Sequence, residues 1–324
     1  MAERFISDIS QEHLLTWYAD NYRRLPWRET RDPYSILVSE VMLQQTQAER
    51  VVPKYHEFLA RFPTLDALAD APASAVIRAW AGLGYNRRAL NLQRACRVVV
   101  ERFGGVIPSD PAVLASLPGI GPYTAGAIAC FAFEQDVGFV DTNIRRVIHR
   151  MLAGTELPEA LMTAREINHA AHDLVPAGRG YLWNQALMEL GATICRARMT
   201  ECERCPLQHD CRARPTIQTV LATEPRRARR PEPKFETSSR YYRGRIIDAL
   251  RSAGSVGFSL AELGAAIKPE FAPTDANWIA GHVAGLRDDG LLVEHDVGQR
   301  LVAEEALPYD GAIVDLNRRY SLPD

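Results

Sequence analysis

The sequence lacks any long uninterrupted apolar run. No segment of its 324 residues approaches the roughly 18 consecutive apolar residues of a membrane span. The first residues, Met1 to Arg4, also lack the basic and then apolar pattern of a secretory signal. We therefore expect a cytoplasmic chain without membrane association. Its length suits two or three domains, and a hydrophobic fraction of 47% is ordinary for a globular protein.

An excess of positive charge is missing as well, because the formal net charge is -2. The overall balance gives no support to nucleic-acid binding, which would require a local basic face. The proline-broken basic stretch from Arg226 to Lys234 is one such concentration. Linkers of this composition are most often solvated, although contact with phosphates is an alternative.

Strand patterns are also absent from residues 64–134, where short helical patterns are separated by proline or glycine. Helical patterns also occupy residues 10–22, 34–43, 158–174 and 181–194. Thr46 and Glu49 have the spacing of a capping box, which predicts a helix that begins there and continues through Leu59. Together these patterns predict a mainly helical globule.

What the sequence does contain is a glycine-rich turn, Leu117-Pro118-Gly119-Ile120-Gly121, between two short helical patterns. Pro118, Gly119 and Gly121 predict a tight hairpin, because glycine allows backbone geometry and close approach that side chains would block. Exposed amides beside the helix that begins at Pro122 form a concavity suited to phosphate. The turn therefore predicts helix-hairpin-helix contact with the DNA backbone.

Two carboxylates stand in unusual places. Glu40 interrupts a buried helical pattern, and Asp141 precedes the helical pattern that runs from Ile144 to Leu152. A partnered acid at a helix edge explains Glu40 on structural grounds alone, and an N-cap explains Asp141. General acid and base chemistry is the alternative for both.

Four of the six cysteines are crowded together: Cys195, Cys202, Cys205 and Cys211. In a reducing compartment this favours metal ligation over disulfides. Gaps of six, two and five residues suit a structural zinc ion or a 4Fe-4S cluster, although zinc sites favour two close pairs. Cys96 and Cys130 lie in apolar helical patterns and are predicted to be core residues.

The hairpin, the following aspartate and the four cysteines together resemble the helix-hairpin-helix DNA glycosylases with an iron-sulfur cluster, the superfamily of endonuclease III and MutY. The resemblance covers roughly residues 10–212. It implies a two-lobed helical fold, with a cluster lobe of residues 1–25 and 135–212 and a six-helix lobe of residues 26–134. It also implies that the cofactor is a 4Fe-4S cluster. Residues 213–237 are then a linker.

One position separates the chemistries of this superfamily. Lyases carry a lysine in the second helix of the hairpin, where this sequence has Tyr123. A phenol cannot form a Schiff base, so a monofunctional glycosylase is predicted. The stretches Leu25 to Arg28 and Ser39 to Thr46 resemble the MutY-type adenine glycosylases, which act on adenine opposite 8-oxoguanine.

This resemblance implies roles for both carboxylates once the base has been extruded from the duplex. Glu40 would be the general acid that protonates adenine, and Asp141 would stabilise the oxocarbenium-like sugar. The implied pocket residues are Trp27, Arg28, Tyr123, Asn143 and Gln185. The implied DNA contacts are Leu43, Gln45, Leu83, Tyr85, Arg87 and the hairpin residues Pro118, Gly119 and Gly121. The expected partner is double-stranded DNA with a mispaired adenine, bound by a monomer.

The C-terminal segment, residues 238–324, has its own pattern. Helical patterns at 241–250, 260–267 and 278–289 precede a predicted hairpin of residues 290–294 and 299–302. This predicts a small α+β domain that resembles a winged helix, which binds either DNA or protein. The segment lacks the strand-rich pattern of the Nudix-like domain that many MutY proteins carry.

Two other functions fit part of the sequence. A thymine or uracil mismatch glycosylase uses the same scaffold, but Gln44-Gln45-Thr46 argues against it. A non-catalytic, redox-sensing DNA-binding protein would not need both Glu40 and Asp141.

Overall fold

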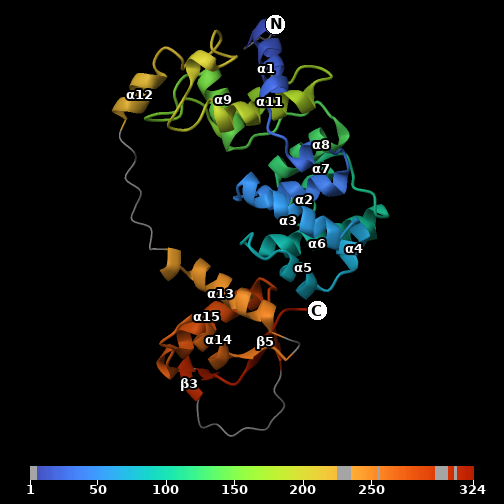
Figure 1. The fold of residues 1–324 in the computed structure, drawn as a ribbon, viewed down its shortest axis with the longest axis vertical. Coiled ribbons are helices and arrows are strands. Elements are labelled where there is room, and N and C mark those ends of the chain that lie inside the picture. Colours follow the sequence, from blue (N-terminus) through green and yellow to red (C-terminus); the bar gives the residue numbers. More distant parts are fainter. Residues whose placement is uncertain (1–5, 225–234, 254–255, 296–305, 310–311) are drawn as a thin grey trace. The chain divides into compact units, whose positions relative to one another are not determined.

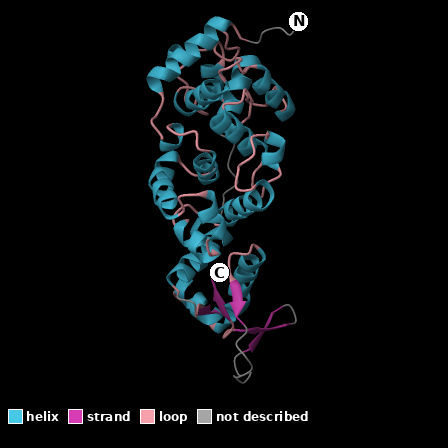
Figure 2. Ribbon diagram, turned by 90° about the vertical axis from the view of Figure 1, so that its right-hand side faces the viewer, coloured by secondary structure: helices cyan, strands magenta, loops and turns pink. Residues whose placement is uncertain are grey.

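The computed structural model describes residues 6–224, 235–253, 256–295, 306–309 and 312–324. Helices dominate, which confirms the prediction of a mainly helical chain (Figure 1). Within the described residues, the strands occur only after Gly257 (Figure 2). No described helix combines the length and the apolar character needed to cross a membrane.

The chain forms two compact units, each built from two segments. Unit 1 contains residues 1–40 and 107–229, and unit 2 contains residues 41–106 and 230–324. This division differs from the predicted lobes, because residues 26–40 and 107–134 lie in unit 1. The C-terminal domain, in turn, shares unit 2 with residues 41–106.

Unit 1 is helical, with its first and last described helices about 200 residues apart in the sequence. Its elements are α1 (Asp8–Asn21), η1 (Pro26–Arg28), α2 (Pro33–Leu43, whose last turn enters unit 2), α7 (Pro111–Ala115), α8 (Pro122–Phe133), α9 (Thr142–Leu152), α10 (Ala164–Asp173), α11 (Gly180–Thr193), η2 (Cys202–Arg204) and α12 (Ile217–Thr223). Helix α11 packs against α1, α8 and α9 and is therefore central to the unit.

Helix α10 begins six residues later than predicted. Thr163 and Glu166 form a capping box, in which the Thr163 hydroxyl accepts from the Glu166 N–H and the Glu166 carboxylate accepts from the Thr163 N–H. The helix therefore starts at Ala164, and residues 158–163 precede it as a loop.

The N-terminal half of unit 2 also consists of helices. They are α3 (Ala48–Arg61), α4 (Leu65–Asp70), α5 (Ala73–Ala79) and α6 (Arg87–Phe103). The predicted capping box at Thr46 is wrong, because α3 has Gln47 at its N-cap without a side-chain hydrogen bond. The Thr46 hydroxyl instead accepts a hydrogen bond from Arg88.

The C-terminal half of unit 2 alternates helices and short strands. Its elements are η3 (Phe235–Thr237), α13 (Ser239–Ser252), β1 (Phe258–Ser259), α14 (Leu260–Ile267), η4 (Pro273–Asp275), α15 (Ala276–Asp288), β2 (Val293–His295), β3 (Ala306–Tyr309), β4 (Ala312–Asp315) and β5 (Arg319–Ser321). Three helices with a small sheet confirm the prediction of a small α+β domain.

The strands pair differently from the predicted hairpin. Strand β2 pairs antiparallel with β5, which also pairs with β1, so the sheet order is β1-β5-β2. A second antiparallel pair joins β3 to β4. The predicted strand at residues 299–302 lies outside the described residues.

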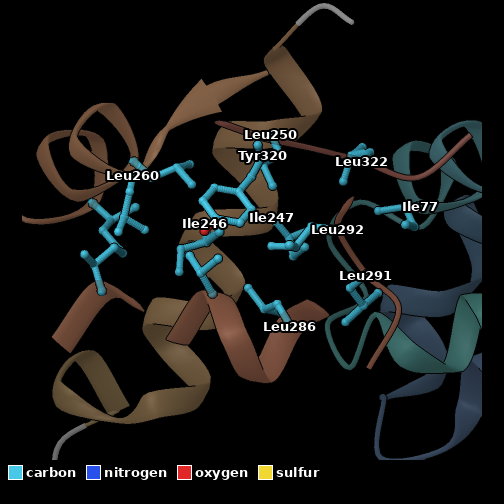
Figure 3. Close-up of a cluster of buried hydrophobic side chains, with 14 of the residues drawn as sticks. Ile77, Ile246, Ile247, Leu250, Leu260, Leu286, Leu291, Leu292, Tyr320 and Leu322 are labelled. Atoms are coloured by element: carbon cyan, nitrogen blue, oxygen red, sulfur yellow. The ribbon is translucent and has the colours of Figure 1, made fainter. Parts of the chain in front are cut away.

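One apolar cluster joins the two halves of unit 2. Ile246, Ile247 and Leu250 of α13 pack in the same cluster as Ile77 of α5 and Leu322 near the C-terminus (Figure 3). Arg78 adds hydrogen bonds to the carbonyl oxygens of Arg251 and Ala253 at 3.2 Å each. The C-terminal domain therefore packs firmly on residues 73–90 and does not form a separate core.

Candidate active site

Helix α2 carries Glu40 into the interior of unit 1. Its neighbours in the helix are almost all apolar, and Glu40 is only 3% exposed. Burial raises the pKa of Glu40 to about 7, because the charged form loses its hydration. A hydrogen bond from Tyr123 and the charge of Arg28 lower it, whereas the charge of Asp141 raises it. Its Oε2 atom is buried and has no hydrogen-bond partner among the described residues.

Asp141 caps the N-terminus of α9. Its Oδ1 accepts a hydrogen bond of 2.6 Å from the Ile144 N–H, and its Oδ2 accepts one of 2.9 Å from the Asn143 side chain. Burial raises the pKa of Asp141, and these hydrogen bonds oppose the rise because they favour the carboxylate. The structural interpretation of Asp141 is thus confirmed, and the capping role itself holds the carboxylate near Glu40.

The hairpin between α7 and α8 places Tyr123 beside both carboxylates. Leu117 and Ile120 are buried and anchor the turn, in which Gly119 has a positive φ of 76°. Gly121 is the N-cap of α8, and no atom lies within 4 Å of the place where its Cβ would be. The pKa of Tyr123 is raised well above its usual value by burial and by the charges of Glu40 and Asp141. Its phenol is therefore a hydrogen-bond donor to Glu40.

Two of the remaining predicted pocket residues, Arg28 and Gln185, belong to or adjoin a buried ion pair that the sequence did not reveal. Arg28 donates to Glu189 at 2.8 Å, and the two side chains are 6% and 0% exposed. Glu189 also accepts from Arg23 at 2.7 Å. Gln185, itself buried, lies one helical turn before Glu189 on the same side of α11. Glu189 is the one acidic residue of the mostly apolar helix α11, which was the sequence signal for it.

Trp27 is 7% exposed in η1, next to Arg28. Asn143 is held from both sides, since it donates to Asp141 and its Oδ1 accepts from Arg146 at 2.8 Å. A Cβ atom at Gly191 would lie 2.6 Å from the Cβ of Asn143, so this glycine allows α11 to pack closely on α9. The start of α9 is therefore rigidly positioned.

The four crowded cysteines face one small cavity. Cys195, Cys202, Cys205 and Cys211 all line it together with Arg150, and none forms a disulfide. Burial raises the pKa of the Cys205 thiol to about 12. Among the described residues, no three metal-binding side chains are close enough together to hold a single ion.

Two arginines of α9 hold the cysteine loop. Arg146 donates to the Cys195 carbonyl at 2.7 Å, and Arg150 donates to the carbonyls of Arg196 at 2.8 Å and Ala197 at 3.0 Å. Arg150 is 2% exposed and also pairs with Glu156 at 2.6 Å. Arginines four residues apart lie on one helix face, which was the sequence signal for this contact.

The other predicted DNA contacts belong to unit 2. Gln45 and Tyr85 both have positive φ angles, 56° and 46°, and both are exposed. Leu43 is half-buried, and Leu83 is only 4% exposed. Arg87 is exposed and pairs with Asp289 at 3.2 Å.

Arg88 positions these two turns. Its guanidinium donates to the carbonyl oxygens of Val41, Met42 and Gln44 at 2.6–3.0 Å, and to those of Leu83 and Gly84 at 3.1 and 3.3 Å. It therefore caps the last turn of α2 and ties it to the turn that carries Tyr85. No sequence signal distinguished this arginine from the adjacent, exposed Arg87.

Comparison with known proteins gives consistent results. Residues 38–172 match the HhH-GPD superfamily of base excision DNA repair proteins. The adenine DNA glycosylase of Mycolicibacterium smegmatis is 42% identical over 246 residues, or 76% of this chain and 81% of that relative.

Two solved structures share the fold. A thermostable thymine-DNA glycosylase superposes with a TM-score of 0.59 and 32% identity, over 64% of this chain and 95% of its own. Endonuclease III in a non-covalent DNA complex does so with a TM-score of 0.56 and 22% identity, over the same shares. The chain belongs to the adenine DNA glycosylase family, within the helix-hairpin-helix (HhH-GPD) superfamily of base excision DNA repair proteins.

Proposed function

We propose that this protein is a monofunctional DNA glycosylase that removes adenine mispaired with 8-oxoguanine or guanine from double-stranded DNA. The observation that carries the proposal is the pair of carboxylates, Glu40 and Asp141, buried in different surroundings beside Tyr123. Family membership supports the choice of base, because the Mycolicibacterium smegmatis relative is an adenine DNA glycosylase.

Glu40 is the proposed general acid. With a pKa of about 7, the Glu40 carboxyl is protonated in a large fraction of the molecules at neutral pH. The Oε2 atom has no hydrogen-bond partner among the described residues, and the hydrogen bond from Tyr123 keeps the carboxyl in place. Donation of this proton to a ring nitrogen of the extruded adenine makes the base a better leaving group. The C1′–N bond then breaks, and its electron pair departs with the base.

Asp141 is the proposed partner of the cationic sugar. The two hydrogen bonds to its carboxylate and the N-terminus of α9 favour its ionised form, so the two carboxyl groups take different protonation states. A fixed negative charge stabilises the oxocarbenium-like sugar as the base departs, and water then completes the hydrolysis.

Tyr123 supports a reaction that ends at base release. A phenol with a raised pKa stays neutral and cannot form the imine through which a lysine cleaves the sugar. The product is then an intact abasic strand.

We further propose that Cys195, Cys202, Cys205 and Cys211 hold a 4Fe-4S cluster. The support is that all four free thiols line one cavity, yet no three of the described metal-binding side chains suit a single ion. Each iron of such a cluster takes a different cysteine, so its ligands stand further apart than those of one zinc ion. Iron, sulfide and zinc analysis of the purified protein tests this, because a colourless, zinc-containing protein contradicts it.

One assay tests the choice of base. Duplexes that contain A:8-oxoguanine, A:G, T:G or U:G are incubated with the protein, and abasic sites are then cleaved with alkali. We expect release of adenine only, and no strand cleavage before alkali. Release of thymine or uracil with adenine untouched contradicts the proposal and favours the activity named for the solved thymine-DNA glycosylase, which is 32% identical.

A further inference from the structure

Unit 2 contains a large groove that the proposed chemistry does not use. It has a volume of about 1260 Å³, and its walls are the turns around Gln45 and Tyr85 on one side and α13 on the other. Small-molecule pockets have volumes of roughly 300–1000 Å³. The size of the groove therefore suits a segment of a polymer better than a metabolite.

The groove is strongly basic in a chain whose net charge is -2. Among the described residues, seven arginines and two aspartates line it, with no lysine or glutamate. Asp289 pairs with Arg87 and Arg243, and Asp248 pairs with Arg251. The groove thus concentrates positive charge that the overall composition hides.

Four of these arginines have no ion-pair partner in the described part of the chain, and one of the four, Arg88, donates to backbone carbonyl oxygens. The other three are Arg50, Arg240 and Arg245. All three are exposed. Arg240 donates to the Tyr85 hydroxyl at 2.7 Å, which uses only one of its five N–H donors. Arg245 donates to the Ala266 carbonyl at 3.2 Å. These guanidinium groups therefore retain donors for an anion.

Two exposed aromatic rings flank Arg240. Tyr85 is 42% exposed and Phe235 is 51% exposed. The Arg240 guanidinium lies 5.6 Å from the centre of the Tyr85 ring and 5.2 Å from that of Phe235. Aromatic faces beside unpaired arginines are the elements with which proteins bind unstacked bases and the adjoining phosphates.

The charge distribution within the C-terminal domain indicates which helix makes the contact. Helix α13 carries four arginines, three of them in the first half of the helix. Helix α15 carries only Arg287, which pairs with Glu294 at 3.1 Å. The basic surface of this winged-helix-like domain is therefore on α13.

We propose that the predicted DNA-contact surface around Gln45 and Tyr85 continues across the groove onto α13, which forms its other wall. Arg50, Arg240 and Arg245 bind the phosphates of one DNA strand. Tyr85 and Phe235 stack against a base that is no longer stacked in the DNA duplex. The proposal rests on the proposed function, because it takes the substrate of that function as the ligand. It assigns DNA binding to a segment that the resemblance to DNA glycosylases did not cover.

The salt dependence of DNA binding tests the phosphate contacts. The affinity of the full chain for an undamaged duplex is measured between about 50 and 200 mM salt. The double variant Arg240→Gln, Arg245→Gln should show a slope of log K against log salt that is smaller by about 0.9 for each lost contact, about 1.8 in all. Arg240→Lys, Arg245→Lys should restore most of the slope, because lysine keeps the charge.

Arg287→Gln is the matched control, since it removes one arginine from the same domain outside the groove. Its slope should equal that of the wild type. A double variant with the wild-type slope overturns the proposal and leaves the groove as a site for an acidic protein. Phe235→Ala should weaken binding to a duplex with one unpaired nucleotide roughly tenfold, whereas Phe235→Tyr should not. Equal loss for both, or for neither, contradicts the stacking contact.

The two proposals fail in different ways. If adenine is released but the slope is unchanged, only the groove proposal fails. If the slope changes but no adenine is released by the wild type, only the proposed function fails.

Discussion

The carboxylate site of unit 1 and the arginine groove of unit 2 use charge in opposite ways. In unit 1 a few charged side chains are buried, and burial raises the pKa values of both carboxyl groups. In unit 2 many charged side chains are exposed, and Arg88 is the one arginine of the groove whose pKa is moved far, to about 10. Buried charges act strongly at short range, and exposed ones attract a polyanion from a distance. Variants in unit 1 should therefore change the rate of excision, and variants of exposed arginines in unit 2 should change affinity.

The largest effect is expected for Glu40→Gln. Glutamine has nearly the same shape but donates no proton, so excision should fall by roughly 100- to 10,000-fold. Single-turnover rates with an A:8-oxoguanine duplex measure this. DNA affinity should stay within about twofold of the wild type. A variant that excises adenine at the wild-type rate would remove Glu40 from the mechanism.

Asp141→Asn should be the next most damaging change. Asparagine is an equally good N-cap, so α9 should remain intact, but the fixed negative charge is lost. We expect excision to fall by roughly 100- to 1,000-fold, the cost of one well-placed electrostatic contact. An unchanged melting temperature is the control that separates this loss from unfolding. Wild-type activity would leave Asp141 with a capping role alone.

Arg88→Gln tests an exception to this contrast between the units, because Arg88 belongs to unit 2 but its guanidinium is bound like that of a buried residue. It donates to five carbonyl oxygens at the end of α2 and in the turn that carries Tyr85. Glutamine cannot reach them all, so the variant should lose about 3 kcal/mol of unfolding free energy. Urea denaturation measures the change. A loss below about 1 kcal/mol would show that water replaces the guanidinium without cost.

The pH dependence of excision follows from Glu40. Its pKa of about 7 means that the protonated form disappears above neutrality, so the rate should fall tenfold per unit at higher pH. The stability of the fold should change with pH in the same direction as the rate. Because the folded pKa lies above the ordinary 4.5, the stability that the buried carboxyl contributes is lost as pH rises from about 4.5 through 7.

The same linkage predicts that Glu40→Gln is more stable than the wild type above neutral pH. The difference should grow by about 3 kcal/mol between pH 4.5 and pH 8, since glutamine has no charged form. Urea denaturation at several pH values measures it, and Asp141→Asn serves for comparison. Parallel stability curves for Glu40→Gln and the wild type would mean that Glu40 titrates normally.

The site residues proposed from the sequence are those that have local signatures. The hairpin glycines, the acid in an apolar helix and the spaced cysteines each follow from a few neighbouring residues. The partners of these residues were not predictable. Glu189 meets Arg28 across 161 residues of chain, and Arg88 meets the end of α2 across more than 40. Such contacts depend on how helices pack, which periodicity alone does not determine.

The predicted domain boundaries differ from the two compact units for a related reason. The linker pattern after Cys211 predicted a separate C-terminal domain, but Ile77 and Leu90 share a core with α13. Amphipathic patterns show that a helix face is buried and do not show what covers it. The arginines of α13 therefore gave no signal of a groove, because its other wall is about 150 residues earlier in the chain.

Arg87→Gln should have the smallest effect and separates the two roles of arginine in unit 2. Arg87 is exposed and pairs with Asp289, which also pairs with Arg243. Loss of the Arg87 guanidinium should therefore lower the free energy of unfolding by less than about 1 kcal/mol. Its DNA contact is a prediction from the resemblance, and the ion pair with Asp289 competes with it. If a phosphate replaces Asp289 on binding, the salt slope should fall by about 0.9. An unchanged slope would show that Arg87 stays with Asp289 and that the basic contacts of this groove come from Arg50 and α13.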